Sequence, residues 1–282
     1  MSQSNKSIIN ASNPNKDTSF SSSKDTAFNT SQDTSFSPNK DTNSQIIENI
    51  MKGTHFLLPT RGPASGVAVT PTEYIATDGI NPYAYVYSFC GVFKGAVPTL
   101  RPYEKIVYCS ETDSYYATDG YCSGRIYTLN CRLEETDSFP LRSVGVVLDI
   151  SLYSESSDPC GCSCSLVVTS PCRTDLFTSK GNYLSTLRQG GRNSRFISFV
   201  QRNNGFAEGF SSDRREYIIF RNGCTETTNE LERCVRLKSL FSTDGGGVWG
   251  LFTKNYSNNY IMPVFENDTL NNGFSRCGTV FP

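Results

Sequence analysis

The sequence lacks several features on which common functions depend. Its 282 residues include one histidine, His55, three methionines and one tryptophan. No stretch approaches the roughly 20 apolar residues that a membrane span requires, and residues 1–40 lack the apolar core of a signal peptide. A Ser-His-Asp or Cys-His mechanism would have to use His55. We therefore expect no membrane span and do not favour a histidine-centred enzyme.

The chain also lacks a surplus of charge of either sign. It has 26 Lys and Arg residues against 27 Asp and Glu residues, which leaves a formal net charge of −1. Nucleic acids and anionic membrane surfaces attract proteins with an excess of positive charge. The composition therefore predicts no nucleic-acid partner, and no motif in the chain indicates a cofactor.

The chain is rich in aromatic residues, glycine and proline, which favour strands and turns. Tyr74–Gly79 reads Tyr-Ile-Ala-Thr-Asp-Gly, and Tyr115–Gly120 reads Tyr-Tyr-Ala-Thr-Asp-Gly. The eleventh residue after each glycine is a cysteine, Cys90 in the first copy and Cys131 in the second. The two stretches are therefore copies of one repeating unit.

The same phase continues along the chain. Successive glycines stand 41, 41, 44 and 40 residues apart at Gly79, Gly120, Gly161, Gly205 and Gly245. A period of about 40 to 45 residues is typical of β-propellers, in which each unit forms one blade. We predict an all-β, propeller-like fold of about five 41-residue units. An antiparallel β-sandwich or jelly roll fits the number of strands equally well.

Short segments rich in β-branched or aromatic residues, separated by Gly, Pro, Asn or Asp, are predicted to form strands. These segments are 66–70, 83–89, 104–109, 125–129, 143–153, 166–169, 195–201, 216–221, 235–241, 248–252 and 260–265. The clearest alternation of apolar residues runs from Val144 to Leu152, as expected for a half-buried strand. No helix is expected after Gly53.

Residues 1–43 contain Ser, Asn, Thr, Lys and Asp with almost no aliphatic side chains, so we predict a disordered, low-complexity tail. Octapeptide repeats within it carry one phenylalanine each, at Phe20, Phe28 and Phe36. One hypothesis is a solvated tail that grew by repetition. The other is that these phenylalanines bind pockets on neighbouring subunits and order the tail.

Two further segments follow the tail. Residues 44–53 predict a short amphipathic docking helix, because Ser44 can cap its start, isoleucines share one face and Gly53 ends it. Residues 54–282 form a β-rich domain that contains all of the cysteines.

Eleven cysteines are many for a protein kept in a reducing cytosol, and if disulfides form, their odd number leaves at least one thiol free or paired with another chain. The disulfide candidates are Cys90, Cys131, Cys160, Cys162, Cys164 and Cys172. Buried free thiols are one alternative. A zinc site is another, but zinc sites usually pair their ligands as C-x2-C to C-x4-C, and a single pair in this chain, Cys160 and Cys164, has that spacing, so we predict no metal.

Asp78, Asp119 and Asp244 recur at one position of the repeat. A closed ring would bring such carboxylates to one rim, and glycoside hydrolysis requires paired acids. Asp-Gly is also a preferred pair for tight hairpin turns, and we interpret these residues as turn residues.

Basic residues concentrate between Lys180 and Arg202, a stretch that holds no acidic residue. Arg188, Arg192 and Arg195 lie around the turn at Gly190, where arginines can bind a carboxylate, sulfate or phosphate. An ordinary solvated hairpin is the alternative.

Two short segments resemble the influenza-type neuraminidases. They are Cys172-Arg-Thr with Thr178 and Gly181, and Gly245-Gly-Gly-Val-Trp with Thr253-Lys. These neuraminidases are β-propellers that cleave sialic acid. The resemblance implies a propeller fold and makes Arg173 the arginine that would bind a substrate carboxylate. It provides no counterpart for the other two arginines of the family, nor for its tyrosine nucleophile.

These observations together predict a non-enzymatic surface, coat or attachment protein. The tail would attach it to other copies of itself or to a coat or capsid scaffold, and the β domain would present loops to a glycan or protein receptor, in a homo-oligomer or assembly. The expected location is extracellular or on a virion or coat surface, with assembly in the cytoplasm also open. The alternative is a glycan-binding or glycan-hydrolysing, sialidase-like propeller.

Overall fold

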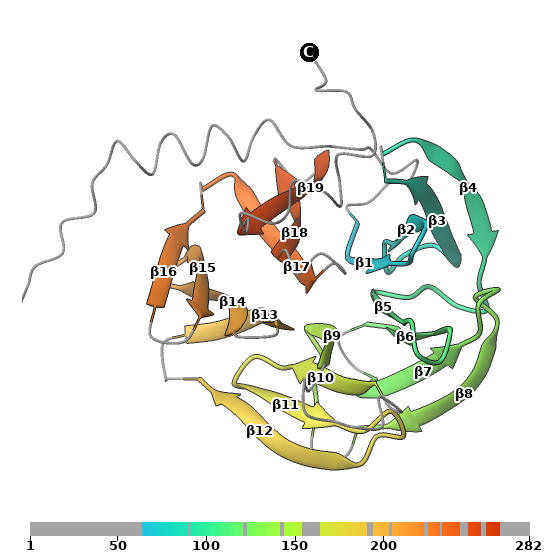
Figure 1. The fold of residues 1–282 in the computed structure, drawn as a ribbon, viewed down its shortest axis with the longest axis horizontal. Coiled ribbons are helices and arrows are strands. Elements are labelled where there is room, and N and C mark those ends of the chain that lie inside the picture. Colours follow the sequence, from blue (N-terminus) through green and yellow to red (C-terminus); the bar gives the residue numbers. More distant parts are fainter. Residues whose placement is uncertain are drawn as a thin grey trace, which may run out of the picture. The chain divides into compact units, whose positions relative to one another are not determined.

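The computed structural model consists of β-strands and turns (Figure 1). It describes residues 64–89, 91–120, 123–141, 144–153, 164–190, 194–202, 205–222, 225–231, 233–242, 248–254 and 258–265. Over these ranges no helix is long and apolar enough to cross a membrane. Several predictions lie outside the described residues: the tail over 1–43 with its three phenylalanines, the helix over 44–53, His55, Cys90, Cys160, Cys162, Arg192 and Asp244.

The described strands form five antiparallel sheets, which we call blades 1 to 5. Blade 1 consists of β1 (Gly66–Val69), β2 (Glu73–Thr77), β3 (Tyr83–Ser88) and β4 (Phe93–Pro98). Blade 2 consists of β5 (Lys105–Cys109), β6 (Ser114–Thr118), β7 (Arg125–Leu129) and β8 (Glu135–Pro140). In each blade the strands are hydrogen-bonded in sequence order.

The later blades repeat this order. Blade 3 consists of β9 (Asp149–Tyr153), β10 (Ser165–Thr169), β11 (Arg173–Phe177) and β12 (Tyr183–Gln189). Blade 4 consists of β13 (Ser194–Arg202), β14 (Gly205–Ser212), β15 (Arg215–Asn222) and β16 (Thr225–Glu230). Blade 5 has three strands among the described residues: β17 (Val235–Ser242), β18 (Val248–Lys254) and β19 (Asn258–Phe265).

The first strand of every blade lies at the centre of the ring (Figure 1). These inner strands contact one another in cyclic order: β1 with β5, β5 with β9, β9 with β13, β13 with β17, and β17 with β1 again. A closed circle of this kind is the arrangement of a β-propeller. The predicted all-β propeller is therefore confirmed, with four four-stranded blades and a fifth of three described strands.

Apolar side chains fill the spaces between neighbouring blades. The contact that closes the ring joins Tyr74 and Tyr87 of blade 1 to Trp249 and Leu251 of blade 5. Four further clusters occupy the other four interfaces. Each fully buried side chain of this size contributes about 1.5–3 kcal/mol through removal from water, so these interfaces hold the blades together.

The Asp-Gly copies occupy equivalent turns. Gly79 and Gly120 lie between the second and third strands of their blades, with φ of 71° and 111°, values that favour glycine over other residues. Gly205 instead begins β14, after the first strand of blade 4. The repeat therefore shifts by one strand after blade 2, because residues 154–163 lengthen the connection between β9 and β10.

One disulfide links two blades. Cys109 at the end of β5 is bonded to Cys164, which directly precedes β10. Cys164 is among the predicted candidates, and Cys109 is not. Cys131 and Cys172, which are also candidates, are exposed in turns and form no disulfide among the described residues.

Candidate ligand-binding cavity

Two cavities lie at opposite ends of the inner strands. The larger, of about 330 Å³, is lined by the residues at the start of these strands, such as Ser65, Leu148 and Arg195. The smaller, of about 150 Å³, is lined by later residues of the same strands, such as Val67 and Leu152. We call them the amino-end cavity and the carboxyl-end cavity. They lie at opposite ends of the centre of the ring.

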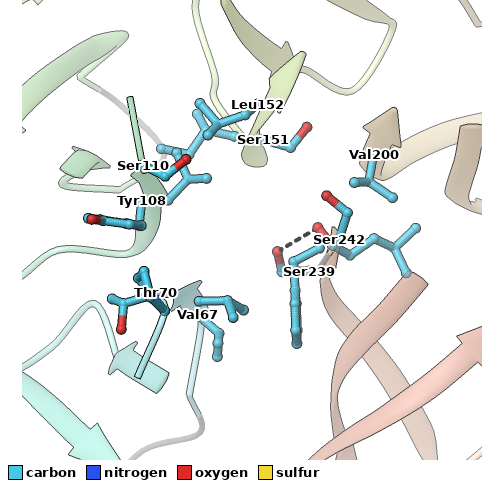
Figure 2. A pocket seen from close by; sticks show the side chains of 15 residues that line it. Val67, Thr70, Tyr108, Ser110, Ser151, Leu152, Val200, Ser239 and Ser242 are labelled. Atoms are coloured by element: carbon cyan, nitrogen blue, oxygen red, sulfur yellow. Dashed lines mark hydrogen bonds between the residues drawn. The ribbon is translucent and has the colours of Figure 1, made fainter. Parts of the chain in front are cut away.

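The carboxyl-end cavity has no charged lining residue. Figure 2 shows Val67, Leu152 and Val200 around this space, with the hydroxyl groups of Ser110 and Ser242 nearby. Its polar groups are largely engaged elsewhere. For example, the hydroxyl of Ser151, also labelled there, donates to the carbonyl oxygen of Phe199 at 2.6 Å.

A buried polar cluster separates the two cavities. Asp149 on β9 is 1% exposed, and its carboxylate accepts hydrogen bonds from the hydroxyls of Ser198 on β13 and Ser239 on β17. Ser198 in turn accepts a hydrogen bond from the backbone N–H of Leu240 at 2.7 Å. Burial raises the pKa of Asp149 to about 6, although Lys105 and the two serines act to lower it. The cluster joins three inner strands.

Lys105, the first residue of β5, links β5 to β17 and to Ser65, which directly precedes β1. Its Nζ donates to the carbonyl oxygens of Ser65 and Lys238, both at 2.6 Å. Burial lowers the pKa of Lys105, and the negative charges of Asp149 and Glu104 oppose this shift. A buried amine that donates to two carbonyl groups fixes the floor of the amino-end cavity rather than presenting a mobile charge.

Glu104 lines the amino-end cavity, and two hydrogen bonds of its backbone fix its position. Its N–H donates to the carbonyl oxygen of Thr118 at 2.6 Å, and its own carbonyl oxygen accepts from the hydroxyl of Ser65 at 2.7 Å. The Asp-Gly turn at Gly120 packs against the Glu104 side chain. A Cβ added to Gly120 would lie 3.2 Å from Oε2 of Glu104. Burial raises the pKa of the Glu104 carboxyl.

Glu216 supplies the second carboxylate of the amino-end cavity. It accepts a hydrogen bond from the backbone N–H of Leu237 at 2.7 Å and pairs with Arg236 at 3.4 Å. Burial is the main cause of the raised pKa of Glu216, while the Leu237 N–H and Arg236 act to lower it. This carboxylate is therefore already oriented by blade 5.

Two cationic side chains of the amino-end cavity, unlike Arg236, form no ion pair with a described residue. Neither Arg195 nor Lys238 forms an ion pair with any residue that the structure describes, and Arg195 is exposed. Four cationic and two acidic side chains line the cavity: Lys105, Arg195, Arg236, Lys238, Glu104 and Glu216. The cavity can therefore accept a ligand with a negative charge and several hydroxyl groups.

The predicted ligand-binding arginines that the structure describes differ in their surroundings. Arg173 on β11 pairs with Asp175 at 2.7 Å, and Arg188 on β12 pairs with Glu208 at 3.1 Å. Neither arginine lines either cavity, whereas Arg195 lines the amino-end cavity. Among the predicted ligand-binding arginines that the structure describes, Arg195 is thus the one placed at a cavity.

The carboxylates of Asp78 and Asp119 accept hydrogen bonds from groups close to them in sequence. Oδ1 of Asp78 accepts hydrogen bonds from the backbone N–H groups of Ile80 and Asn81 at 2.9 and 2.8 Å. Asp119 accepts from the hydroxyl of Tyr127 at 2.6 Å. Both positions fit the interpretation as turn residues, and neither lines a cavity.

Sequence reasoning did not identify Glu104, Lys105 or Asp149. A signal was present, because Lys105 and Asp149 are the charged residues at the first position of inner strands that contain no other charged residue. Glu216, Arg236 and Lys238 gave no comparable signal: the first lies in β15 and the others alternate with apolar residues along β17.

No family model matches this chain, and no curated protein matches it. Among solved structures, the chain is similar to hydrazine synthase from Kuenenia stuttgartiensis, with 11% sequence identity and a TM-score of 0.44 over 67% of this chain. This chain covers 61% of that structure's length. We draw no functional argument from this similarity.

Proposed function

We propose that the protein is a non-enzymatic surface or attachment protein whose propeller binds an acidic glycan in the amino-end cavity. The observation that carries this proposal is the presence of Arg195 and Lys238, without ion-pair partners among the described residues, beside the carboxylates of Glu104 and Glu216. Cations bind the carboxylate or sulfate of an acidic sugar, and carboxylates accept hydrogen bonds from its hydroxyl groups.

A binding role is supported by how the cavity is built. Glu216 is fixed by a backbone N–H and by Arg236, and Lys105 is fixed by two carbonyl groups. Groups held in this way before the ligand arrives lower the cost of ordering on binding. They favour recognition over a reaction in which such a group would have to move.

The test is binding of the purified protein to immobilised sialylated, sulfated and neutral oligosaccharides. We expect the acidic glycans to bind, and the R195E/K238E variant to lose at least about tenfold in affinity, since two charge-assisted contacts are reversed. R132E is the control for a charge reversal outside the cavity, and it is compared with R195E alone, because Arg132 is also exposed but lies in the turn between β7 and β8. Equal binding by the cavity variant and the control would refute the site.

Glycan hydrolysis is the second candidate. Glu104 and Glu216 share one cavity, and burial raises the pKa of both, a combination found in catalytic acids. This candidate predicts release of the aryl group from aryl glycosides of acidic sugars, and loss of that release in E104Q and E216Q. Binding without turnover would support the first proposal.

Attachment through the tail is a further part of the proposal. Phe20, Phe28 and Phe36 would contact other copies of the protein or a coat scaffold, on an extracellular or virion surface after assembly in the cytoplasm. The Cys109–Cys164 disulfide supports exposure to an oxidising compartment. Sedimentation of the full chain and of its F20S/F28S/F36S variant tests these contacts. We expect the variant to sediment as a smaller assembly than the full wild-type chain.

A further inference from the structure

The linked cysteines of blades 2 and 3 have an acidic neighbour. Cys109 and Cys164 are 0% and 6% exposed, with Cα atoms 6.2 Å apart, and Oε2 of Glu111 lies 3.7 Å from Sγ of Cys164. Ligand atoms from all three residues lie within 4.8 Å of one another. Two buried sulfurs and an exposed carboxylate therefore meet at one point of the blade 2–blade 3 interface.

The carboxylate gains little from the disulfide itself. A disulfide sulfur carries no proton, so it cannot donate a hydrogen bond to Glu111. No residue in the described ranges other than Cys164 approaches the Glu111 carboxylate at hydrogen-bonding distance. The Glu111 carboxylate is therefore available to bind a cation together with the two sulfurs once the disulfide is reduced.

The spacing suits a tetrahedral ion. A zinc ion binds thiolate sulfur at about 2.3 Å and carboxylate oxygen at about 2.0–2.2 Å, which places the two ligand atoms roughly 3.5 Å apart at a tetrahedral angle. The observed separation between Glu111 and Cys164 is 3.7 Å. Glu111 is exposed, so an ion can enter from solvent and keep a water molecule as its fourth ligand.

We propose that Cys109, Cys164 and Glu111 form a redox-controlled site for a thiophilic divalent cation such as Zn²⁺. A dithiol reductant supplies two electrons and two protons, its own thiols become a disulfide, and the Cys109–Cys164 bond becomes two thiols. Binding of Zn²⁺ then releases these two protons and forms two Zn–S bonds and one Zn–O bond. In the reverse direction a disulfide oxidant accepts two electrons from the thiolates and takes up two protons to become two thiols, while the Cys109–Cys164 bond forms again and the ion is released.

The site keeps blades 2 and 3 linked under both conditions. In an oxidising compartment the link is the disulfide, and in a reducing one it is the metal ion between the same residues. A protein that assembles in the cytoplasm and then enters an oxidising environment would thus hold this interface throughout. This consequence agrees with the proposed attachment function, but the site does not depend on it.

Cobalt(II) is a suitable probe, because its thiolate complexes absorb light and report the ligands directly. The full chain is reduced with a phosphine under anaerobic conditions and titrated with Co²⁺, followed by displacement with Zn²⁺. We expect a tetrahedral, thiolate-bound Co²⁺ signal in the reduced protein and none in the oxidised protein. The signal should disappear in C109S/C164S and persist in C131S/C172S, the control for exposed thiols.

Two further measurements keep the test independent of folding in the cysteine variants. E111Q retains both sulfurs and should weaken Co²⁺ binding by about tenfold or more. In the wild type, Zn²⁺ should protect Cys109 and Cys164 from alkylation, as mapped by mass spectrometry, while Cys131 and Cys172 react. The proposal is overturned if the reduced wild type takes up no cobalt, if C131S/C172S loses the signal, or if E111Q binds as well as the wild type.

Discussion

The hydroxyl of Ser239 on β17 donates a hydrogen bond that is shared between the two carboxylate oxygens of Asp149 on β9, at 3.0 and 2.9 Å. The two strands belong to blades 5 and 3, which are not neighbours in the ring. Asp149 also accepts from Ser198 on β13, in the blade between them. One carboxylate therefore links three blades at the centre of the propeller, and its protonation state affects the stability of all three.

The first prediction concerns pH. Because burial raises the pKa of Asp149 to about 6, the folded state keeps a proton between about pH 4 and pH 6 that the unfolded chain has released. The contribution of Asp149 to the free energy of unfolding is therefore largest below about pH 4 and falls, by up to about 3 kcal/mol, as the pH rises to about 6.

Urea denaturation from pH 4 to pH 7 measures this dependence. D149N should flatten the fall in unfolding free energy over that window, and D137N, which alters an exposed carboxylate on β8, should retain it. A D149N curve parallel to that of the wild type would show that other carboxylates with raised pKa values, such as Glu104, account for the dependence.

The second prediction concerns Lys105. K105M removes the donor for two buried carbonyl groups, those of Ser65 and Lys238, and the positive charge that acts on Asp149. We expect a loss of about 2 to 5 kcal/mol in the free energy of unfolding.

K94M is the matched control for K105M. Lys94 pairs with Glu73 at 3.2 Å, but its side chain is 48% exposed, and an exposed pair of this kind contributes about 0–1 kcal/mol. Chemical denaturation compares the two variants. Losses of similar size would contradict the central role of Lys105.

The third prediction concerns the close packing of Gly66 in β1 against the backbone of Glu104 and Lys105. A Cβ on Gly66 would lie 2.8 Å from the carbonyl oxygen of Glu104 and 2.8 Å from Cα of Lys105, and both are backbone atoms that cannot move aside. G66A should therefore cost about 1–3 kcal/mol in stability by overpacking. A Cβ on Gly95 in β4 meets nothing within 4 Å, so G95A should be neutral or slightly stabilising. Thermal unfolding of both variants gives the comparison, and an equal effect would argue against close contact between β1 and β5.

The fourth prediction concerns the disulfide. Cys109 and Cys164 are 55 residues apart, and closing a loop of that length lowers the entropy of the unfolded chain by the equivalent of about 4 kcal/mol. C109A, measured with a metal chelator present, should lose stability on this scale, and C131A should lose little because Cys131 is exposed and unbonded. Denaturant midpoints under oxidising conditions measure both. A C109A midpoint equal to that of C131A would count against the disulfide.

The architecture could be predicted from the sequence because its repeat of about 41 residues is typical of propeller blades. The predicted strand segments agree with the structure in part, since they omit four middle strands: β2, β6, β11 and β14. The segments predicted over 125–129 and 248–252 are β7 and the first part of β18. The predicted strand over 143–153 is shorter than expected: β9 begins at Asp149, and the apolar residues before it, such as Val144, are buried in a non-strand segment.

The outer strands β8 and β16 have few of the apolar residues from which strands were predicted. β8 and β16 read Glu-Thr-Asp-Ser-Phe-Pro and Thr-Glu-Thr-Thr-Asn-Glu, and each has a neighbour on one side alone. Edge strands with polar side chains resemble loops in sequence, because no buried face imposes alternation on them.

The candidate site could not be predicted because no single segment contains it. Glu104 precedes the first strand of blade 2, Arg195 and Glu216 come from blade 4, and Lys238 comes from blade 5. What they share is a position around one cavity at the centre of the ring. That position follows from the direction of the inner strands, which is known only once the ring is built.

The apolar cluster that joins Tyr74 to Trp249 has a consequence for synthesis of the chain. The ribosome makes blade 1 first, but the surface that covers Tyr74 belongs to the blade made last. Until that blade emerges, Tyr74 and Tyr87 remain open to water and to other nascent chains. The time needed to translate the intervening blades therefore sets how long this aromatic surface requires protection, for example by a chaperone.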